Sequence, residues 1–251
     1  MRLVDVNAGN VEQTGFFCYM SRRKSPGFKR KLDWLKTRFE EGMRLKMLGD
    51  GERGFVEYLP GELAWRPVEA KGYMFIHCLW VVGKSKGKGY GKKMLDVVVR
   101  DARKDGMKGV AILASEGNWL AGPKLLERNG FEVVDEAPPR FLLMARSFCK
   151  SRTPKFTGEW EQKAKRFGKG LIVVRTDQCP YIDDAVNSVR DAASERGLRF
   201  REVVLKSAED VRKRCPSAYG TFSIVLDGRL LSYHYLTKRD LEQRLAEAGQ
   251  G

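Results

Sequence analysis

Hydrophobic positions along the first 148 residues follow two periodicities, which together predict a domain of mixed strands and helices. Short apolar runs between turn residues predict strands, and apolar residues three or four positions apart predict amphipathic helices. The predicted strands cover residues 3–6, 43–48, 54–58, 73–82, 110–114, 131–134 and 141–144. The predicted helices cover residues 11–20, 26–41, 90–104 and 123–128. The resulting order of elements is βααβββαβαββ.

A second periodic region begins at Leu171, after a polar and basic stretch with one proline and three glycines. We expect residues 149–169 to form a linker that contains a short helix at 160–166. Beyond it, the predicted strands cover residues 171–174, 200–205, 221–226 and 230–235, and the predicted helices cover 183–196, 208–214 and 238–248. This order is βαβαββα. The sequence therefore predicts a first domain at 1–148 and a second at 170–251.

The formal net charge of +15 would attract polyanions, and the densest basic run covers residues 21–31. Nucleic-acid binding is therefore one reading of the charge. No helix-turn-helix, zinc or RNP pattern supports it. The alternative is a solvated basic surface that also serves phosphate contacts.

The cysteines are five in number, scattered, and without a C-x-x-C pair: Cys18, Cys78, Cys149, Cys179 and Cys215. This usage argues against a zinc site and against a secreted disulfide framework, so we expect no metal and a reducing cytoplasm. No segment has the apolar length of a membrane span, and the first residues lack a secretory signal, so we expect no membrane association.

A loop of glycines and lysines joins the strand that ends at residue 82 to the helix that begins at Tyr90. Its alternate glycines carry no side chain that would keep a ligand from the backbone amides. Unpaired amides and the positive dipole end of a helix favour an anion. Mobile positive charge around the turn comes from Lys84, Lys86, Lys88 and Lys92. The loop is therefore predicted to bind a phosphate or pyrophosphate.

Two common glycine motifs do not fit this loop. The dinucleotide fingerprint requires G-x-G-x-x-G, and a P-loop requires Lys and then Ser or Thr after its last glycine. The spacing of Lys86, Gly89 and Gly91, preceded by residues 79–81, instead resembles the acyl-coenzyme A signature of GNAT-type N-acyltransferases. Lys86 stands where that family usually has Arg or Gln. Residues 118–131 also resemble the family's second motif.

This resemblance implies an α+β mixed-sheet acyl-CoA N-acyltransferase fold and acetyl-CoA as the acyl donor. The residues that would then contact the coenzyme are Leu79, Trp80, Val81, Lys86, Gly87, Lys88, Gly89, Tyr90, Gly91, Lys92 and Asn118. We expect its pyrophosphate at 86–92 and its pantetheine arm along 79–81.

His77 is the first candidate for the base that deprotonates the amine, since imidazole titrates near neutral pH. A packed histidine is the alternative, and the rival bases are Glu57, Glu69 and Glu116. The family often has a tyrosine as general acid, and Leu126 occupies that position here. Ser115 and Tyr90 are the replacements, unless the thiolate leaves unassisted.

The second domain resembles the thioredoxin and glutaredoxin superfamily, and Cys179 falls on the turn where that superfamily keeps its reactive cysteine. A helix N-terminus would lower the pKa of this thiol. The dithiol partner position holds Ile182, and residues 219–221 replace the superfamily's cis-proline. Cys179 is therefore predicted to be a monothiol, with pairing to Cys215 or a vestigial role left open.

As a whole, the order of domains resembles the YoaP-like two-domain acetyltransferases. The predicted function is acetyl-CoA-dependent N-acetylation of a small-molecule amine or of an amine on a protein or RNA. In the alternative, the protein is a thiol-handling or redox protein in which Cys179 carries or presents a thiol or acyl group. An RNA-associated modifying factor is the third hypothesis.

Overall fold

The computed structural model describes residues 2–117 and 119–248, and the chain divides into two compact units. The first unit holds Met1–Arg23, Leu32–Ala64 and Val68–Phe156. The second holds Thr157–Gly251 together with two short segments from the N-terminal part, Lys24–Lys31 and Trp65–Pro67. The division is therefore not a single cut in the sequence.

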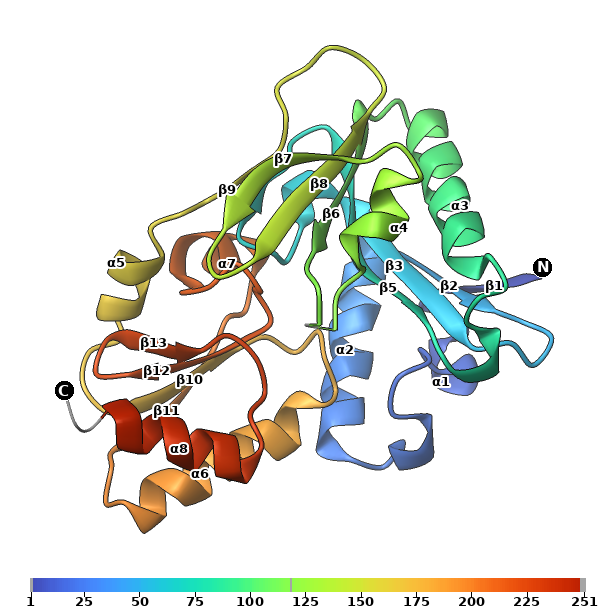
Figure 1. Ribbon diagram of the computed structural model, residues 1–251. Coiled ribbons are helices and arrows are strands. Elements are labelled where there is room, and N and C mark those ends of the chain that lie inside the picture. Colours follow the sequence, from blue (N-terminus) through green and yellow to red (C-terminus); the bar gives the residue numbers. More distant parts are fainter. Residues whose placement is uncertain (1, 118, 249–251) are drawn as a thin grey trace. The chain divides into compact units, whose positions relative to one another are not determined.

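The first unit is built on a seven-stranded mixed sheet in the order β1-β2-β3-β5-β6-β8-β7 (Figure 1). Its strands are β1 (Leu3–Val6), β2 (Arg44–Leu48), β3 (Gly54–Pro60), β5 (Tyr73–Val81), β6 (Gly109–Ala114), β7 (Glu132–Ala137) and β8 (Phe141–Ser147). Only the pairing of β5 with β6 is parallel. Two further strands, β4 (Val68–Glu69) and β9 (Lys155–Phe156), pair with each other. The predicted mixed sheet is confirmed.

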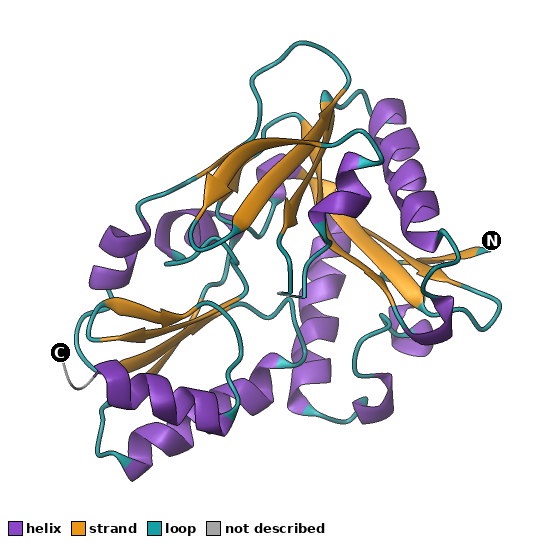
Figure 2. Ribbon diagram, viewed as in Figure 1, coloured by secondary structure: helices purple, strands orange, loops and turns teal. Residues whose placement is uncertain are grey.

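Helices cover the sheet because their apolar faces match its buried positions. The elements are α1 (Val11–Thr14), α2 (Pro26–Glu40), α3 (Tyr90–Lys104) and α4 (Pro123–Glu127), with short 3-10 turns η1 (Met20–Arg22), η2 (Gly61–Leu63) and η3 (Gly83–Ser85) (Figure 2). Met94, Leu95 and Val98 of α3 share one buried cluster with Ile76 and Leu79 of β5. One face of β5 is thus packed beneath α3.

The predicted helix at 11–20 is wrong beyond Thr14. Gly15 takes a left-handed φ of 76°, which ends α1. Phe17 and Tyr19 also have positive φ values, 78° and 57°. A right-handed helix cannot pass through such residues, so this segment runs as a loop into η1.

The second unit has a four-stranded sheet in the order β11-β10-β12-β13. Strand β10 (Leu171–Arg175) is parallel to β11 (Phe200–Val204) and antiparallel to β12 (Phe222–Leu226), and β13 (Arg229–Ser232) pairs antiparallel with β12. The helices are α5 (Trp160–Lys165), α6 (Ile182–Glu195), α7 (Ala208–Arg214) and α8 (Lys238–Ala248). Within this unit, α6 and α8 lie on one face of the sheet and α5 and α7 on the other (Figure 1). The predicted βαβαββα order is confirmed.

Across the described part of the chain, every helix is too short or too polar to cross a bilayer.

Candidate active site

Strands β5 and β6 separate halfway along their length, in the first unit. Their parallel pairing runs from Tyr73–Gly109 to Ile76–Ile112, whereas β5 continues to Val81 alongside β3 only. The register of β5 on β3 shifts at this point, so that His77 is an extra residue, a β-bulge. From residue 79 to the end of β5 at Val81, the backbone edge that faces away from β3 is not paired with β6 in the described chain, which leaves room for a ligand along this edge.

The predicted anion loop lies directly beyond this edge. Gly89 is the N-cap residue of α3 with a left-handed φ of 76°, and no side chain caps the helix. The amides of the first turn therefore have no acceptor within the helix. A Cβ added at Gly87 or Gly89 would meet nothing within 4 Å, so the space over these amides is open. The loop fits a pyrophosphate group.

The lysines of the loop differ in how far their charge is already balanced. Lys88 Nζ lies 2.7 Å from Glu52 Oε1, and Lys92 Nζ lies 2.7 Å from Asp96 Oδ2. The hydrogen bond from Lys88 holds the pKa of Glu52 below its usual value, with help from Ser85. Lys84 and Lys86 are exposed and make no ion pair within 4.0 Å among the described residues. The mobile charge is therefore concentrated in these two.

Two residues that hold the anion loop in place, Ser85 and Glu52, were not predicted from the sequence. The buried Ser85 hydroxyl donates to Glu52 Oε2 at 2.6 Å and accepts the Arg53 amide at 2.8 Å. These bonds tie η3 to the β2–β3 turn. Neither residue belongs to a glycine motif, so no local pattern marked them.

The three predicted pantetheine-contact residues on β5 have different environments. Leu79 is buried in the cluster beneath α3, and Val81 packs against the same cluster. Trp80 points to the opposite face and stacks on Trp119, with ring centroids 5.8 Å apart. Trp119 was not predicted. The predicted contact at Asn118 lies outside the described residues.

His77 lies buried beside a carboxylate. Its Nδ1 is 3.7 Å from Glu57 Oε1, and both side chains are at most 4% exposed. The rings of Trp34 and Phe75 have centroids 6.2 and 5.9 Å from the imidazole. The structure thus brings together His77 and Glu57, two of the four predicted candidates for the base.

The other two rivals lie elsewhere. Glu69 is on β4, where it forms an ion pair with Lys155 at 3.3 Å, and Glu116 is exposed in the loop after β6. Leu126, at the position expected for the acid, is fully buried in the core cluster. Of the two replacement hydroxyls, Ser115 is 1% exposed and Tyr90 is half-exposed at the start of α3.

Cys179, in the second unit, lies between β10 and α6 and is half-buried. The Tyr235 hydroxyl donates to its Sγ at 2.8 Å. Burial raises the pKa of the thiol, although the Tyr235 hydroxyl, the Tyr181 amide and the charges of Lys31 and Arg66 oppose this. The predicted lowering of the Cys179 pKa is therefore wrong in net direction, because desolvation outweighs these opposing contacts.

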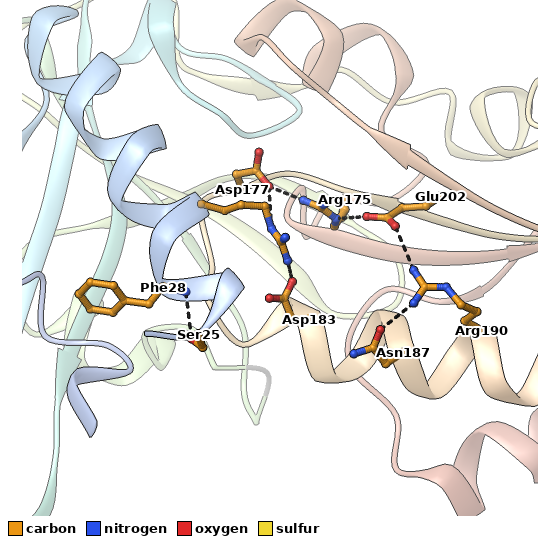
Figure 3. Close-up of polar contacts among 9 residues, drawn as sticks. Ser25, Phe28, Arg175, Asp177, Asp183, Asn187, Arg190 and Glu202 are labelled. Atoms are coloured by element: carbon orange, nitrogen blue, oxygen red, sulfur yellow. Dashed lines mark hydrogen bonds and ion pairs between the residues drawn. The ribbon is translucent and has the colours of Figure 1, made fainter. Parts of the chain in front are cut away.

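A chain of alternating charges holds the turn around Cys179 (Figure 3). Arg175 bonds Asp177 and, at 2.6 Å, Glu202, which in turn lies 3.5 Å from Arg190. Arg30, from the segment Lys24–Lys31, pairs with Asp177 and with Asp183 at the start of α6.

Further bonds hold the same turn and residues 219–221, which are linked to it by the Thr176 amide bonded to the Thr221 carbonyl at 3.0 Å. Gln178 Nε2 donates to the Trp65 carbonyl and to Thr176 Oγ1, both at 3.0 Å. The buried Arg66 guanidinium donates to the Tyr219 carbonyl and to Thr221 Oγ1. Residues distant in sequence therefore hold this turn, and no local pattern predicts them.

All five cysteines are free thiols, and Cys215 donates from its buried Sγ to the Ser217 carbonyl at 3.3 Å. No group of three or more His, Cys, Asp and Glu residues within residues 2–117 and 119–248 is arranged to hold a metal ion.

Comparison with known proteins gives consistent relatives. The profile of the Acetyltransferase (GNAT) family matches residues 16–131. The uncharacterized N-acetyltransferase YoaP of Bacillus subtilis is 31% identical over 249 residues, which cover 98% of both chains. An L-methionine sulfoximine/L-methionine sulfone acetyltransferase of Pseudomonas aeruginosa is 32% identical over 108 residues, 42% of this chain and 60% of its own.

Among solved structures, the PaiA N-acetyltransferase of Thermoplasma acidophilum in complex with coenzyme A aligns with a TM-score of 0.41 and 13% identity, over 59% of this chain and all of that one. The relative from Bacillus subtilis matches almost the whole length of the chain, and the profile match spans α2, the bulged β5, the anion loop and α3. The protein therefore belongs to the GNAT family of acetyltransferases and is an N-acetyltransferase whose donor is acetyl-CoA.

Proposed function

We propose that the protein acetylates a primary amine of a small molecule, or of a protein- or RNA-linked acceptor, in the opening between β5 and β6. The observation that carries this is the separation of the two strands after Ile76–Ile112, directly before an uncapped helix N-terminus. The open edge suits the amides of a pantetheine arm, and the α3 amides suit its pyrophosphate.

Lys86 and the first-turn amides of α3 hold the pyrophosphate in this proposal, and the backbone of residues 79–81 aligns the pantetheine arm. Acetyl-CoA supplies the thioester carbonyl that the amine attacks. Lys84 adds charge at the entrance of the loop, while Lys88 mainly anchors Glu52. The side chains of the anion loop thus have separate tasks, some in binding and some in bracing.

His77 accepts the proton of the attacking amine in this mechanism. The Glu57 carboxylate, 3.7 Å from Nδ1, stabilises the imidazolium that forms. The bulge places His77 where β5 leaves β6, which is where the acetyl group has to be reached. Leu126 lies in the core and Tyr90 is at the pyrophosphate end of the donor, so Ser115, which directly follows β6, is the proposed proton donor to the departing thiolate.

Calorimetry and a coenzyme A release assay test this function. We expect acetyl-CoA to bind and a panel of amines, beginning with α-amino acids, to be acetylated, since the relative from Pseudomonas aeruginosa acts on amino-acid analogues. His77→Gln should lower kcat about 10²-fold or more, as for loss of a general base. The coenzyme affinity should remain, and Glu69→Gln is the control. No binding at millimolar acetyl-CoA would contradict the proposal.

We further propose that the second unit is a thioredoxin-like domain and that the protein works in a reducing cytoplasm. The support for the fold is the strand order β11-β10-β12-β13, with β10 parallel to β11 and antiparallel to β12. Helices on both faces of that sheet add to it. The free thiols support the location.

A second candidate function rests on Cys179. Tyr235 donates to its sulfur, and this bond stabilises a thiolate if one forms. In this alternative Cys179 takes an acyl group from a thioester: a new S–C bond forms, the old one breaks, and the thiol proton passes to the departing thiolate. Intact mass spectrometry after incubation with acetyl-CoA decides. An acyl adduct that forms in the wild type and is absent in Cys179→Ser supports Cys179 as the acyl carrier. Full amine turnover by Cys179→Ser excludes Cys179 from the reaction.

A further inference from the structure

Four aromatic side chains form a continuous row across the first unit, and we call them the aromatic row: Phe17, Phe55, Trp80 and Trp119. The rings of Phe17 and Phe55 have centroids 5.0 Å apart. Phe55 of β3 and Trp80 of β5 are directly opposite strand partners. Trp80 and Trp119 stack at 5.8 Å with an interplanar angle of 26°. The row ends in the loop between β6 and α4.

The outer end of this row is open to solvent. Trp119 is 65% exposed although it already stacks on Trp80, whereas Trp34 of the same unit is 6% exposed. Large apolar side chains that stay exposed beside other aromatic rings mark surfaces where a ligand or partner binds. Both end residues also have left-handed backbone angles, φ 78° at Phe17 and 58° at Trp119. Bulky residues rarely adopt these angles, and such strain is found preferentially at ligand clamps.

The row and the proposed base share the face of β5 that points away from α3. Ile76 and Leu79 are packed beneath α3, and His77 instead contacts the ring of Phe75. Trp80 follows Leu79, so its side chain points to the same side as His77. The pyrophosphate site is at the start of α3, on the other side. The row is therefore placed for the acceptor rather than for the donor.

The charges around the row select among acceptors. The Arg53 guanidinium lies 6.0 Å from the Phe17 ring centroid, and the neighbouring Glu52 is engaged by Lys88 and Ser85. The end of the row at Phe17 is thus positively charged. This charge disfavours polycationic acceptors and suits flat rings that are neutral or carry an anionic group.

We propose that the aromatic row is the acceptor subsite and that the acceptor carries its primary amine on a short arm from a flat, neutral or anionic aromatic ring, which stacks on Trp119. This inference rests on the proposed function and adds the class of acceptor. Trp119 and Trp80 are then specificity-determining residues. Stacking of a flat ring on an aromatic side chain is typically strong enough to change affinity about tenfold.

A matched pair of amines tests the inference: 2-phenylethylamine, with a flat ring, and 2-cyclohexylethylamine, with a puckered ring of the same size. We expect kcat/KM to favour the flat ring about tenfold in the wild type, through KM. Trp119→Leu should remove this preference, and Trp119→Phe should restore most of it. The acetyl-CoA affinity should stay within twofold in both variants. Equal loss for both amines, or no loss for either, would overturn the subsite.

Binding without acetyl-CoA provides an independent readout. Saturation-transfer NMR should show stronger transfer to 2-phenylethylamine than to 2-cyclohexylethylamine, and Trp119→Leu should equalise them. Equal transfer in the wild type overturns the inference whether or not the enzyme turns over. Weaker acetyl-CoA binding in Trp119→Leu would assign the row to the donor, and a dimer that this variant dissociates would assign it to a second copy. Failure of the proposed function would give a different result, namely no acetyl-CoA binding and no turnover of any amine.

Discussion

Two strand-to-helix turns, 82–89 between β5 and α3 and 176–181 between β10 and α6, follow the same local course but are filled differently. The first contains Gly83, Gly87 and Gly89 at positive φ, and the space where their side chains would lie is open. The second contains no glycine, and its side chains bond to one another and to two short segments of the same unit. Each turn delivers a helix N-terminus.

The difference teaches that a helix N-terminus alone does not make an anion site. At α3 no side chain caps the first-turn amides, the space where side chains at Gly87 and Gly89 would lie is open, and no acidic residue lies in the first turn. At α6 the first turn carries Asp183 and Asp184, so negative charge from the chain itself already offsets the dipole. Cys179 is half-buried there, and this partial burial is the largest contribution to the raised pKa of its thiol. The strand-to-helix turn at 82–89 is therefore free to bind a ligand, and we call it the open turn. The turn at 176–181 is filled by its own side chains, and we call it the closed turn.

The largest expected effect breaks the open turn. Gly89→Val forces a β-branched residue into a left-handed angle and puts a side chain over the amides, so we expect acetyl-CoA to bind about a hundredfold more weakly, or about 2.7 kcal/mol. Calorimetry measures this. Gly106→Val is the matched control, since Gly106 follows the other end of α3 with φ 68° and open space. An equal loss of affinity in both variants would mean that strain in α3 is responsible, and not the loss of the anion-binding loop.

The next effect breaks the closed turn. Arg175 is 8% exposed and bonds both Asp177 and Glu202, so Arg175→Met leaves two half-buried carboxylates without their main partner. We expect the free energy of unfolding of the second unit to fall by about 2 kcal/mol. Urea denaturation followed by hydrogen exchange measures it. Lys213→Met, which removes the exposed pair with Glu209, should leave the free energy of unfolding almost unchanged, because solvent screens exposed ion pairs. Similar values for the two variants would refute a structural role for the network.

Local pattern predicted those parts of the fold that burial alone determines. The limits of α3, Tyr90–Lys104, were predicted without error, because a long amphipathic stretch follows a glycine-rich loop. The end of α1 was not, since one residue, Gly15, takes a backbone angle that its neighbours in sequence do not reveal. The site shows the same contrast. The glycines identify the anion loop in the sequence, whereas Glu52, which holds that loop in place, comes from the β2–β3 turn.

The closed turn shows why other contacts of the site could not be predicted from the sequence. Arg30 and Arg66 contribute to the surroundings of Cys179 from segments about 150 and 110 residues away along the chain. No periodicity links such positions, because the contact depends on the whole fold. The ionisation of Cys179 could not be predicted for a related reason: a motif locates the helix N-terminus, and only packing gives the desolvation that opposes it.

A smaller effect distinguishes the contributions of two lysines near the open turn to acetyl-CoA binding. Lys86 has no ion pair among the described residues, and the charge of Lys92 is offset by Asp96. We expect Lys86→Gln to weaken acetyl-CoA binding about fivefold at low salt and less at high salt, since exposed charges are screened. Lys92→Gln should change it by about twofold or less. Calorimetry at two ionic strengths measures both, and a larger effect at Lys92 would contradict this division.

The smallest effect concerns the thiol of the closed turn. Tyr235 donates to Cys179, which stabilises the thiolate, so Tyr235→Phe should raise the pKa of Cys179 further and slow its alkylation at pH 8 about threefold. Iodoacetamide rates at several pH values, followed by peptide mass spectrometry, measure this, with the exposed Cys149 as internal reference. Tyr233→Phe is the control.

The pH profile separates ionisation from access. A lost donor moves the midpoint of the profile to higher pH, whereas better access raises the rate at every pH and leaves the midpoint in place. The folded-state pKa of Cys179 is raised, so its contribution to the free energy of unfolding is complete below the unfolded-state pKa and is lost as the pH rises through the folded-state value. Tyr235→Phe should extend this loss to higher pH. A midpoint that stays put or falls would show that the hydroxyl does not act on the thiolate, and the closed turn would then owe the ionisation of its cysteine to burial alone.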